Sequence, residues 1–257
     1  MGSEMCIRDS LRLEYASTSQ ERSSFSSKPD FKMNVKLKQL QNKFRISFES
    51  VDPEEDETIL NSKTEDRDNN PALEDSFYRL SIGFMKEQKK YWHLSADTGV
   101  KVESRPNPFV KTKGRRSFYF NDFEFKLVNR AFLEDIDGFS NYSDMNLYTK
   151  LSRDFSFSYS NKFVWQNNIN ELSTSHGPSI HQVIDDKQSV SYNIRTRFLN
   201  KPSYAITGHE VFSTYRRDLY KRWLFLGLTP GISFFAEDDY EKLAFIKLKL
   251  QAIFGDF

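Results

Sequence analysis

Cysteine is almost absent from this chain, since Cys6 is the only one in 257 residues. A single thiol excludes a disulfide framework and a cysteine-ligated zinc site. Long apolar runs are missing as well: the longest, Trp223 to Leu228, is far shorter than the eighteen or so residues of a membrane-spanning helix. The 37 Lys and Arg nearly balance the 36 Asp and Glu. That balance excludes a nucleic-acid binder that works by bulk positive charge.

Aromatic residues, by contrast, are abundant. The chain has 24 Phe, 12 Tyr and 3 Trp, which make up 15% of its residues, yet its mean hydropathy is −0.66. A soluble core rarely holds so many rings beside 28% charged residues, because buried rings need apolar neighbours. The composition therefore fits an ordinary soluble domain poorly.

The first ten residues, MGSEMCIRDS, resemble translated adaptor sequence at the start of a gene fragment. They contain no apolar core and no small-residue cleavage site, so they do not form a signal peptide. We expect residues 1–10 to be a non-native leader, with an ordinary irregular N-terminal segment as the alternative. We expect residues 11–257 to form one domain.

Hydrophobic residues recur with a period of two from Leu11 onward, which is the pattern of strands with one apolar and one polar face. The polar faces carry serine, asparagine and basic side chains. The apolar faces include Phe155, Phe157, Tyr159, Val190, Tyr192, Ile194, Ile246, Leu248, Leu250 and Phe254.

This alternation predicts about fourteen strands, with twelve as the lower alternative, in an all-β, antiparallel, up-and-down fold. Most of the segments are 8 to 14 residues long, and a tilted strand needs about 9–11 residues to cross a bilayer. The segments are 11–19, 31–38, 42–51, 77–87, 90–103, 108–119, 123–134, 139–151, 154–166, 178–185, 189–199, 203–216, 222–235 and 241–257.

Two kinds of β-barrel show such alternation: a soluble barrel with its apolar faces inward, and an outer-membrane barrel with its apolar faces toward lipid. Fourteen strands with aromatic apolar faces would enclose an implausibly large apolar interior. Tyr and Trp recur near segment ends, as in the aromatic girdles of membrane barrels. The three long connections, 20–30, 52–76 and 167–177, fall at one end of the strands, and no connection at the other end exceeds five residues. These features favour a bacterial outer-membrane β-barrel.

The C-terminal strands support this interpretation by resemblance. The stretch Tyr215–Tyr220, the following Trp223, Pro230 and the acidic turn at 238–239 are similar to a group of uncharacterised proteobacterial outer-membrane proteins. The final Phe257 resembles the assembly signal of such barrels, although it is out of phase with the apolar row that ends at Phe254; a bulge at Gly255 would restore the phase. The resemblance implies a location and a fold, with the barrel-assembly machinery, lipid and lipopolysaccharide as partners.

Basic residues on the polar strand faces are the candidate functional residues. In a barrel they would line the lumen and favour anionic solutes, because like charges concentrate counter-ions. The alternative is a closed interior in which acidic residues pair with these bases across strands. The candidates are Lys36, Lys38, Arg45, Lys126, Arg130, Arg195, Arg197, Lys247 and Lys249.

Catalytic and metal-binding signals are weak. His93, Ser95 and Asp97 share a strand face, but neighbours on one face lie roughly 6.5–7 Å apart, too far for a hydrogen-bonded relay within the strand. The acidic segment 52–76 lacks the ligand spacing of a calcium loop. We therefore expect no enzyme, cofactor or metal site, and no nucleic-acid partner. The sequence predicts a channel with a basic lumen or a structural barrel; the alternatives are a barrel enzyme acting on lipid or lipopolysaccharide, and a soluble barrel that binds an apolar ligand.

Overall fold

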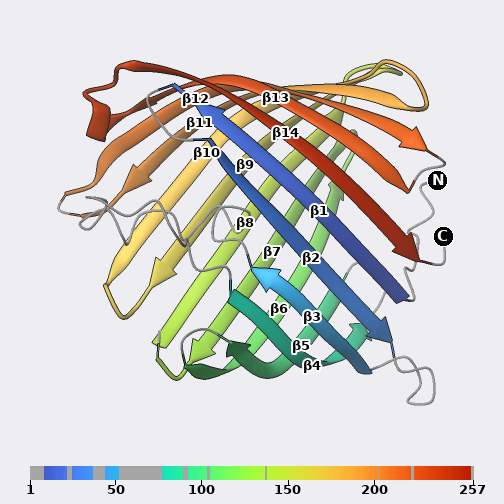
Figure 1. The fold of residues 1–257 in the computed structure, drawn as a ribbon, viewed down its shortest axis with the longest axis vertical. Coiled ribbons are helices and arrows are strands. Elements are labelled where there is room, and N and C mark those ends of the chain that lie inside the picture. The colour runs from blue at the N-terminus through green and yellow to red at the C-terminus, as the bar shows by residue number, and fades with distance from the viewer. Residues whose placement is uncertain are drawn as a thin grey trace.

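The computed structural model describes residues 9–21, 25–36, 44–51, 77–88, 92–102, 105–136, 138–201, 203–220 and 223–255. Within this part of the chain, fourteen antiparallel strands form one closed barrel, each paired with its neighbours in sequence (Figure 1). The strands are β1 (Asp9–Gln20), β2 (Ser26–Lys36), β3 (Phe44–Val51), β4 (Phe77–Gln88), β5 (Trp92–Val102), β6 (Pro106–Phe120), β7 (Phe123–Glu134), β8 (Gly138–Lys150), β9 (Phe155–Gln166), β10 (Glu171–Val183), β11 (Gln188–Leu199), β12 (Ala205–Tyr220), β13 (Leu224–Phe235) and β14 (Lys242–Gly255).

The first and last strands close the barrel. Each residue of β1 from Ser10 to Gln20 lies opposite a residue of β14, from Gly255 back to Phe245. The closure leaves no free sheet edge, and it brings both described ends of the chain to the same rim (Figure 1). The predicted fold class and strand number are therefore confirmed. Strand β1 begins at Asp9, two residues before the expected domain start.

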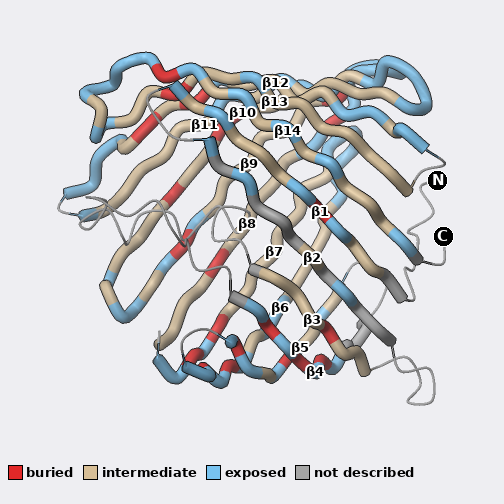
Figure 2. Tube along the Cα trace, in the orientation of Figure 1, coloured by how far each residue is buried: buried red, intermediate tan, exposed pale blue. Residues whose placement is uncertain are grey.

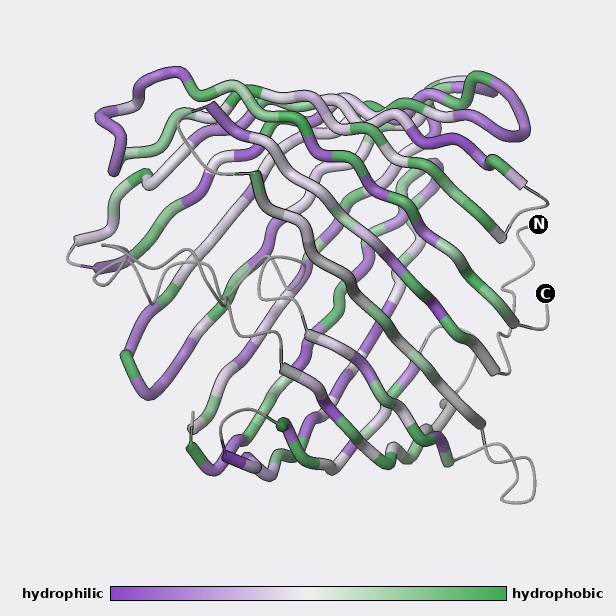
Figure 3. Tube along the Cα trace, viewed as in Figure 1, coloured by the Kyte–Doolittle hydropathy of each residue, from purple (hydrophilic) through white to green (hydrophobic). Residues whose placement is uncertain are grey.

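Polar and apolar residues alternate along the strands because successive side chains point to opposite faces (Figure 3). In β5, Trp92 and Leu94 are 45% and 52% exposed, whereas Asp97 and Lys101 are 4% and 7% exposed. The exposed residues are the apolar ones, and the buried residues are the charged ones. A soluble barrel would have the reverse arrangement, so the soluble-barrel alternative is wrong.

Strand β10 is longer than expected. The sequence predicts a loop at 167–177 and a strand from residue 178, but β10 already begins at Glu171. The Gly177–Pro178 pair suggested a break. Proline lacks the N–H that a ladder needs, and the pairing of β10 with β11 skips Gly177 and Pro178 while the pairing with β9 continues through both. The strand tolerates Pro178 because the ladder is interrupted on one side only.

The loop lengths therefore differ from the prediction. Strand β2 begins at Ser26 and β10 at Glu171, so of the three long connections at the rim away from the termini only 52–76 remains long. At the other rim, the connection 37–43 exceeds the five residues expected. The acidic segment 52–76 lies outside the described residues.

Buried residues gather toward the rim that carries the 52–76 connection, away from the labelled N and C ends (Figure 2). On β6 and β8, inward residues near that rim, such as Asn107, Phe109 and Tyr142, are buried, whereas Tyr119 and Tyr148 near the opposite rim are exposed. We call the packed rim the loop rim and the opposite one the terminal rim. No helix among the described residues is long and apolar enough to span a membrane.

Candidate functional site: the inner wall

Ion pairs that skip strands identify the concave inner face. Arg45 on β3 donates to Asp97 on β5 at 2.7 Å (Arg45 Nη2 to Asp97 Oδ1). Between them lies Gly83 of β4, where a Cβ would stand 1.8 Å from Asp97 Oδ1. Arg79 on β4 reaches Glu134 on β7 at 3.2 Å. Side chains three strands apart meet only on the inside of a curved sheet, so charged residues with this alternation face inward.

A cluster of charges and rings packs against the inner wall at the loop rim. Glu134 accepts from Arg79 and lies 3.7 Å from the Lys101 ammonium. The Arg79 guanidinium lies 5.0 Å above the Phe132 ring and 5.7 Å from the Phe109 ring. Arg79, Lys101 and Glu134 are all less than 9% exposed. We call these five residues the Arg79 cluster; it narrows the interior on one side of the loop rim.

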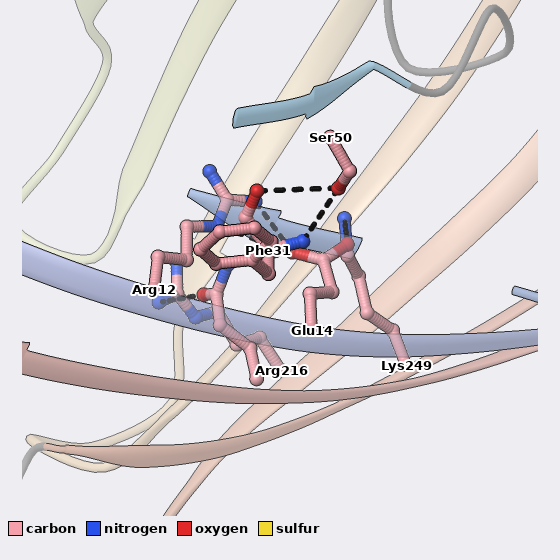
Figure 4. Close-up of polar contacts among 7 residues, drawn as sticks. Arg12, Glu14, Phe31, Ser50, Arg216 and Lys249 are labelled. Carbon is pink, nitrogen blue, oxygen red and sulfur yellow. Dashed lines mark hydrogen bonds and ion pairs between the residues drawn. The ribbon is translucent and has the colours of Figure 1, made fainter. Parts of the chain in front are cut away.

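The seam between β1 and β14 holds a second polar group (Figure 4). The buried Glu14 carboxylate accepts from the Arg12 guanidinium and forms an ion pair with Lys249. Gln251 also donates to Glu14 at 2.9 Å and accepts from Arg216 at 3.3 Å. The first and last strands are thus joined through side chains as well as through the backbone ladder.

Two further groups of inward ion pairs join neighbouring strands. Arg130 donates to Asp144 on the neighbouring strand at 2.7 Å. Glu210 accepts from Arg197 at 2.9 Å and lies 3.5 Å from Arg195. Each of the ion pairs described here joins strands at most three apart and therefore follows the wall.

Barrel geometry explains why they follow the wall. Fourteen strands spaced about 4.8 Å apart and tilted by about 40° form a barrel roughly 28 Å across between backbones. An eight-stranded barrel is just filled by its own side chains, whereas sixteen strands leave an aqueous channel. This barrel lies close to the second case.

Basic residues concentrate on one part of the inner wall. Lys111, Lys113 and Arg115 follow one another on the inward face of β6, and Lys126 and Arg130 lie on the adjacent face of β7. We call these five residues the basic wall. Strands β9–β11 carry fewer inward bases, namely Lys162, Arg195 and Arg197, among uncharged residues that include Ser156, Ser158, Ser160, Ser175, Ser179, Ser191 and Asn193. The positive charge of the inner surface is therefore densest on β6 and β7.

The strand register places the predicted residues as follows. Arg45, Lys126, Arg130, Arg195, Arg197, Lys247 and Lys249 lie on the inward face, and four of the acids facing them form the ion pairs described above. Lys126 and Lys247 form no ion pair with any described residue. Lys36 lies opposite Arg45 in the register of β2 and β3, and Lys38 lies outside the described residues.

The predicted apolar residues lie on the opposite, outward face. Ile194, Ile246 and Leu248 are about half exposed. Phe254 stacks on Trp223 at 5.1 Å near the terminal rim. Phe257 lies outside the described residues, so its role in assembly stays a prediction. The same face carries Phe155, Phe157, Tyr159, Val190, Tyr192 and Leu250.

His93, Ser95 and Asp97 lie on the inward face of β5, but Asp97 accepts a hydrogen bond from Arg45. Sequence reasoning missed the Arg79 cluster and three residues of the basic wall. Alternation alone could have found Lys111, Lys113 and Arg115, since they occupy every second position of one segment. The pairing of Arg79 with Glu134 depends on barrel curvature and has no sequence signal.

No family model and no curated protein matches this sequence. Solved structures do match over almost the whole chain. A bacterial polysaccharide outer membrane secretin has a TM-score of 0.55 at 9% identity, with 96% of this chain and 98% of that one covered. The CymD monoaromatic hydrocarbon channel also scores 0.55, at 5% identity, with 96% and 88% covered. A loop-deletion mutant of OmpT, an outer membrane protein of Vibrio cholerae, scores 0.51 at 8% identity, with 96% and 99% covered. The chain thus has the fold of bacterial outer-membrane β-barrels.

Proposed function

We propose that the chain lies in the bacterial outer membrane and acts as a channel for small anionic solutes. The outward apolar face meets lipid and lipopolysaccharide, and the barrel-assembly machinery inserts the chain. The observation that supports the channel is the width of a fourteen-stranded closed barrel, which is close to that of barrels with an aqueous channel, and the ion pairs described above follow its wall.

Anion preference follows from the lining. The basic wall places five cations on two adjacent strands, and Lys247 adds another on β14. Neighbouring acids offset part of this charge, as Asp144 does for Arg130. A low-dielectric wall with excess positive charge raises the local concentration of anions. The inward serines of β9–β11 supply uncharged hydroxyls to the solute.

An enzymatic role has less support. Asp97 is held by Arg45, so it does not orient His93 as the third member of a catalytic triad would. We therefore propose a passive channel in place of a barrel lipase or deacylase.

Planar-bilayer conductance tests the channel. Lys126 and Lys247 are the residues to reverse, because an acid at Arg195, Arg197 or Lys249 would face Glu210 or Glu14 and disturb folding. Lys126→Glu with Lys247→Glu shifts the lining by four charge units, and we expect anion preference to fall or reverse. Lys126→Gln with Lys247→Gln is the matched control, with an intermediate shift. Absence of conductance in the native protein, or unchanged selectivity in the Glu variant, would refute the proposal.

A further inference from the structure

The outward surface of β7–β12 carries polar side chains, some at mid-strand positions such as Asn129 and His176 and others nearer the loop rim such as Asn141 and Thr196. The corresponding outward positions of β4 and β14 are apolar, with Leu80, Ile82, Phe84, Ile246, Leu248 and Leu250. In one row of directly paired residues across β9–β12 lie Asn161, His176, Thr196 and His209. Beside this row on β7 and β8 lie Asn129, Asn141 and Ser143. We call these seven residues the outer polar belt.

The members of the outer polar belt bond partly to each other. Asn129 Nδ2 donates to Asn141 Oδ1 at 3.0 Å and to Ser143 Oγ at 2.8 Å. Ser143 Oγ donates to Asn141 Oδ1 at 3.2 Å. Thr196 Oγ1 and His209 Nδ1 lie 3.0 Å apart. These bonds reduce the cost of placing polar groups on a lipid-facing surface.

The belt nevertheless retains unused hydrogen-bonding groups. The His176 ring is stacked between Phe198 at 5.0 Å and Tyr159 at 6.4 Å, measured between ring centroids. Neither of its nitrogens bonds to a described residue, and neither does Nε2 of His209. An imidazole always has a donor or acceptor on each nitrogen. Acyl chains cannot satisfy these groups, so on a lipid-facing wall they call for a protein partner.

We propose that the outer polar belt is the contact surface between two copies of this chain in the membrane. The proposal rests on the proposed membrane location and not on channel activity. The belt contains no charged residue, so it does not suit a lipid phosphate or a charged protein. Asn, Ser, Thr and His each both donate and accept hydrogen bonds, and therefore the same set on a second copy is complementary to it.

The size of the wall sets an upper limit on the contact. Six strands about 4.8 Å apart and a lipid-facing band about 25 Å tall give roughly 700 Å², and a second convex barrel covers only the part of it around the belt, less than the roughly 800 Å² per partner of a typical interface. The aromatic rings beside His176 would surround the polar centre with apolar contact area.

The test measures self-association of the full chain, folded into detergent and into lipid vesicles, by sedimentation equilibrium. The variant is Asn129→Leu with Asn141→Leu and His176→Leu, which makes the wall more apolar and leaves the lipid-facing pattern intact. We expect native oligomers whose dissociation constant rises about thirtyfold in the variant, equivalent to about 2 kcal/mol. The matched control, Leu80→Ile with Leu248→Ile on β4 and β14 outside the belt, should associate as the native protein does.

Heat-modifiable migration on gels checks folding in every sample, so that loss of association is separated from loss of the barrel. A native protein that is monomeric in lipid at high protein-to-lipid ratio would overturn the proposal, and so would oligomers of unchanged affinity in the variant. A native chain that fails to insert into vesicles at all would instead overturn the membrane location. Conductance is not a readout here, because a monomer and an oligomer can both conduct.

Discussion

Replacement of Glu134 by glutamine should be the most costly single change in the inner wall. Glu134 is the carboxylate between Arg79 and Lys101, at 3.2 and 3.7 Å from their nitrogens, and all three side chains are buried. At an effective dielectric constant of about 20, charges at these distances attract by roughly 5 and 4 kcal/mol. Desolvation of the three groups offsets much of this attraction.

The variant keeps the shape of the side chain and removes its charge. Two buried cations then lose a shared counter-ion, and breaking a buried pair in this way costs about 3–5 kcal/mol. We expect Glu134→Gln to lower the free energy of unfolding by about 3 kcal/mol, because other contacts of Arg79 and Lys101 remain. This loss can be measured by urea unfolding of the barrel in lipid vesicles, followed by tryptophan fluorescence.

The matched control is Glu124→Gln on the same inward face of β7. Glu124 accepts from the exposed Tyr119 hydroxyl at 3.3 Å and should lose less than about 1 kcal/mol, as exposed polar contacts usually do. Equal stability of the two variants would refute the view that the Arg79 cluster is a charge-compensated unit. A double change, Arg79→Met with Glu134→Leu, should recover part of the loss because the Arg79 charge is removed together with its counter-ion, whereas Lys101 still loses Glu134.

Two further changes test the assignment of faces and the close packing of the inner wall. Arginine at Ile194 or Leu248 on the outward face should lower stability by about 2–4 kcal/mol, because it lies near the bilayer midplane, whereas arginine at Asn193 or Gln251 on the inward face should have a small effect. Equal tolerance of arginine at all four positions in vesicle refolding would contradict a lipid-facing wall. Gly83→Ala should lower the free energy of unfolding by about 1–3 kcal/mol, because the new Cβ would overlap Asp97 and disturb its bond to Arg45. In the same unfolding measurement Gly114→Ala should be nearly neutral, since its Cβ meets only Leu94 at 4.0 Å.

Strand count and facing were predictable because both depend on local alternation. Strand β7 was expected at 123–134 and has those bounds, since its turn at Asn121–Asp122 follows an uninterrupted pattern. Strand β10 was misjudged because a proline inside a strand looks like a boundary until the neighbouring ladder is known. The local sequence pattern predicts a strand whose bounds depend on its own residues, as in β7. It fails where the pairing with a neighbouring strand compensates for an unfavourable residue, as in β10.

The candidate site was less predictable than the fold. Basic residues such as Arg130 and Arg197 could be placed on the polar face, and one of the two alternatives for the lumen had acids pair with these bases across strands. Which acid meets which base depends on shear and curvature, as Arg79 and Glu134 show. The outer polar belt was missed because His176 and His209 lie on separate strands in the sequence, and only the register places them in one row.

The two polar regions of this barrel follow different physical rules. Inward charges can rely on water as well as on partners, so an excess of bases in the basic wall costs little and can act on solutes at a distance. Outward polar groups have no water, and each unused donor or acceptor must find a partner in protein. For that reason a cation such as Lys126 can stand on the inner face without an ion pair to any described residue. The residues of the outer polar belt, by contrast, are uncharged, lie beside one another and partly bond to each other. Charge on the inner face is therefore evidence about solutes, and polarity on the outer face is evidence about protein partners.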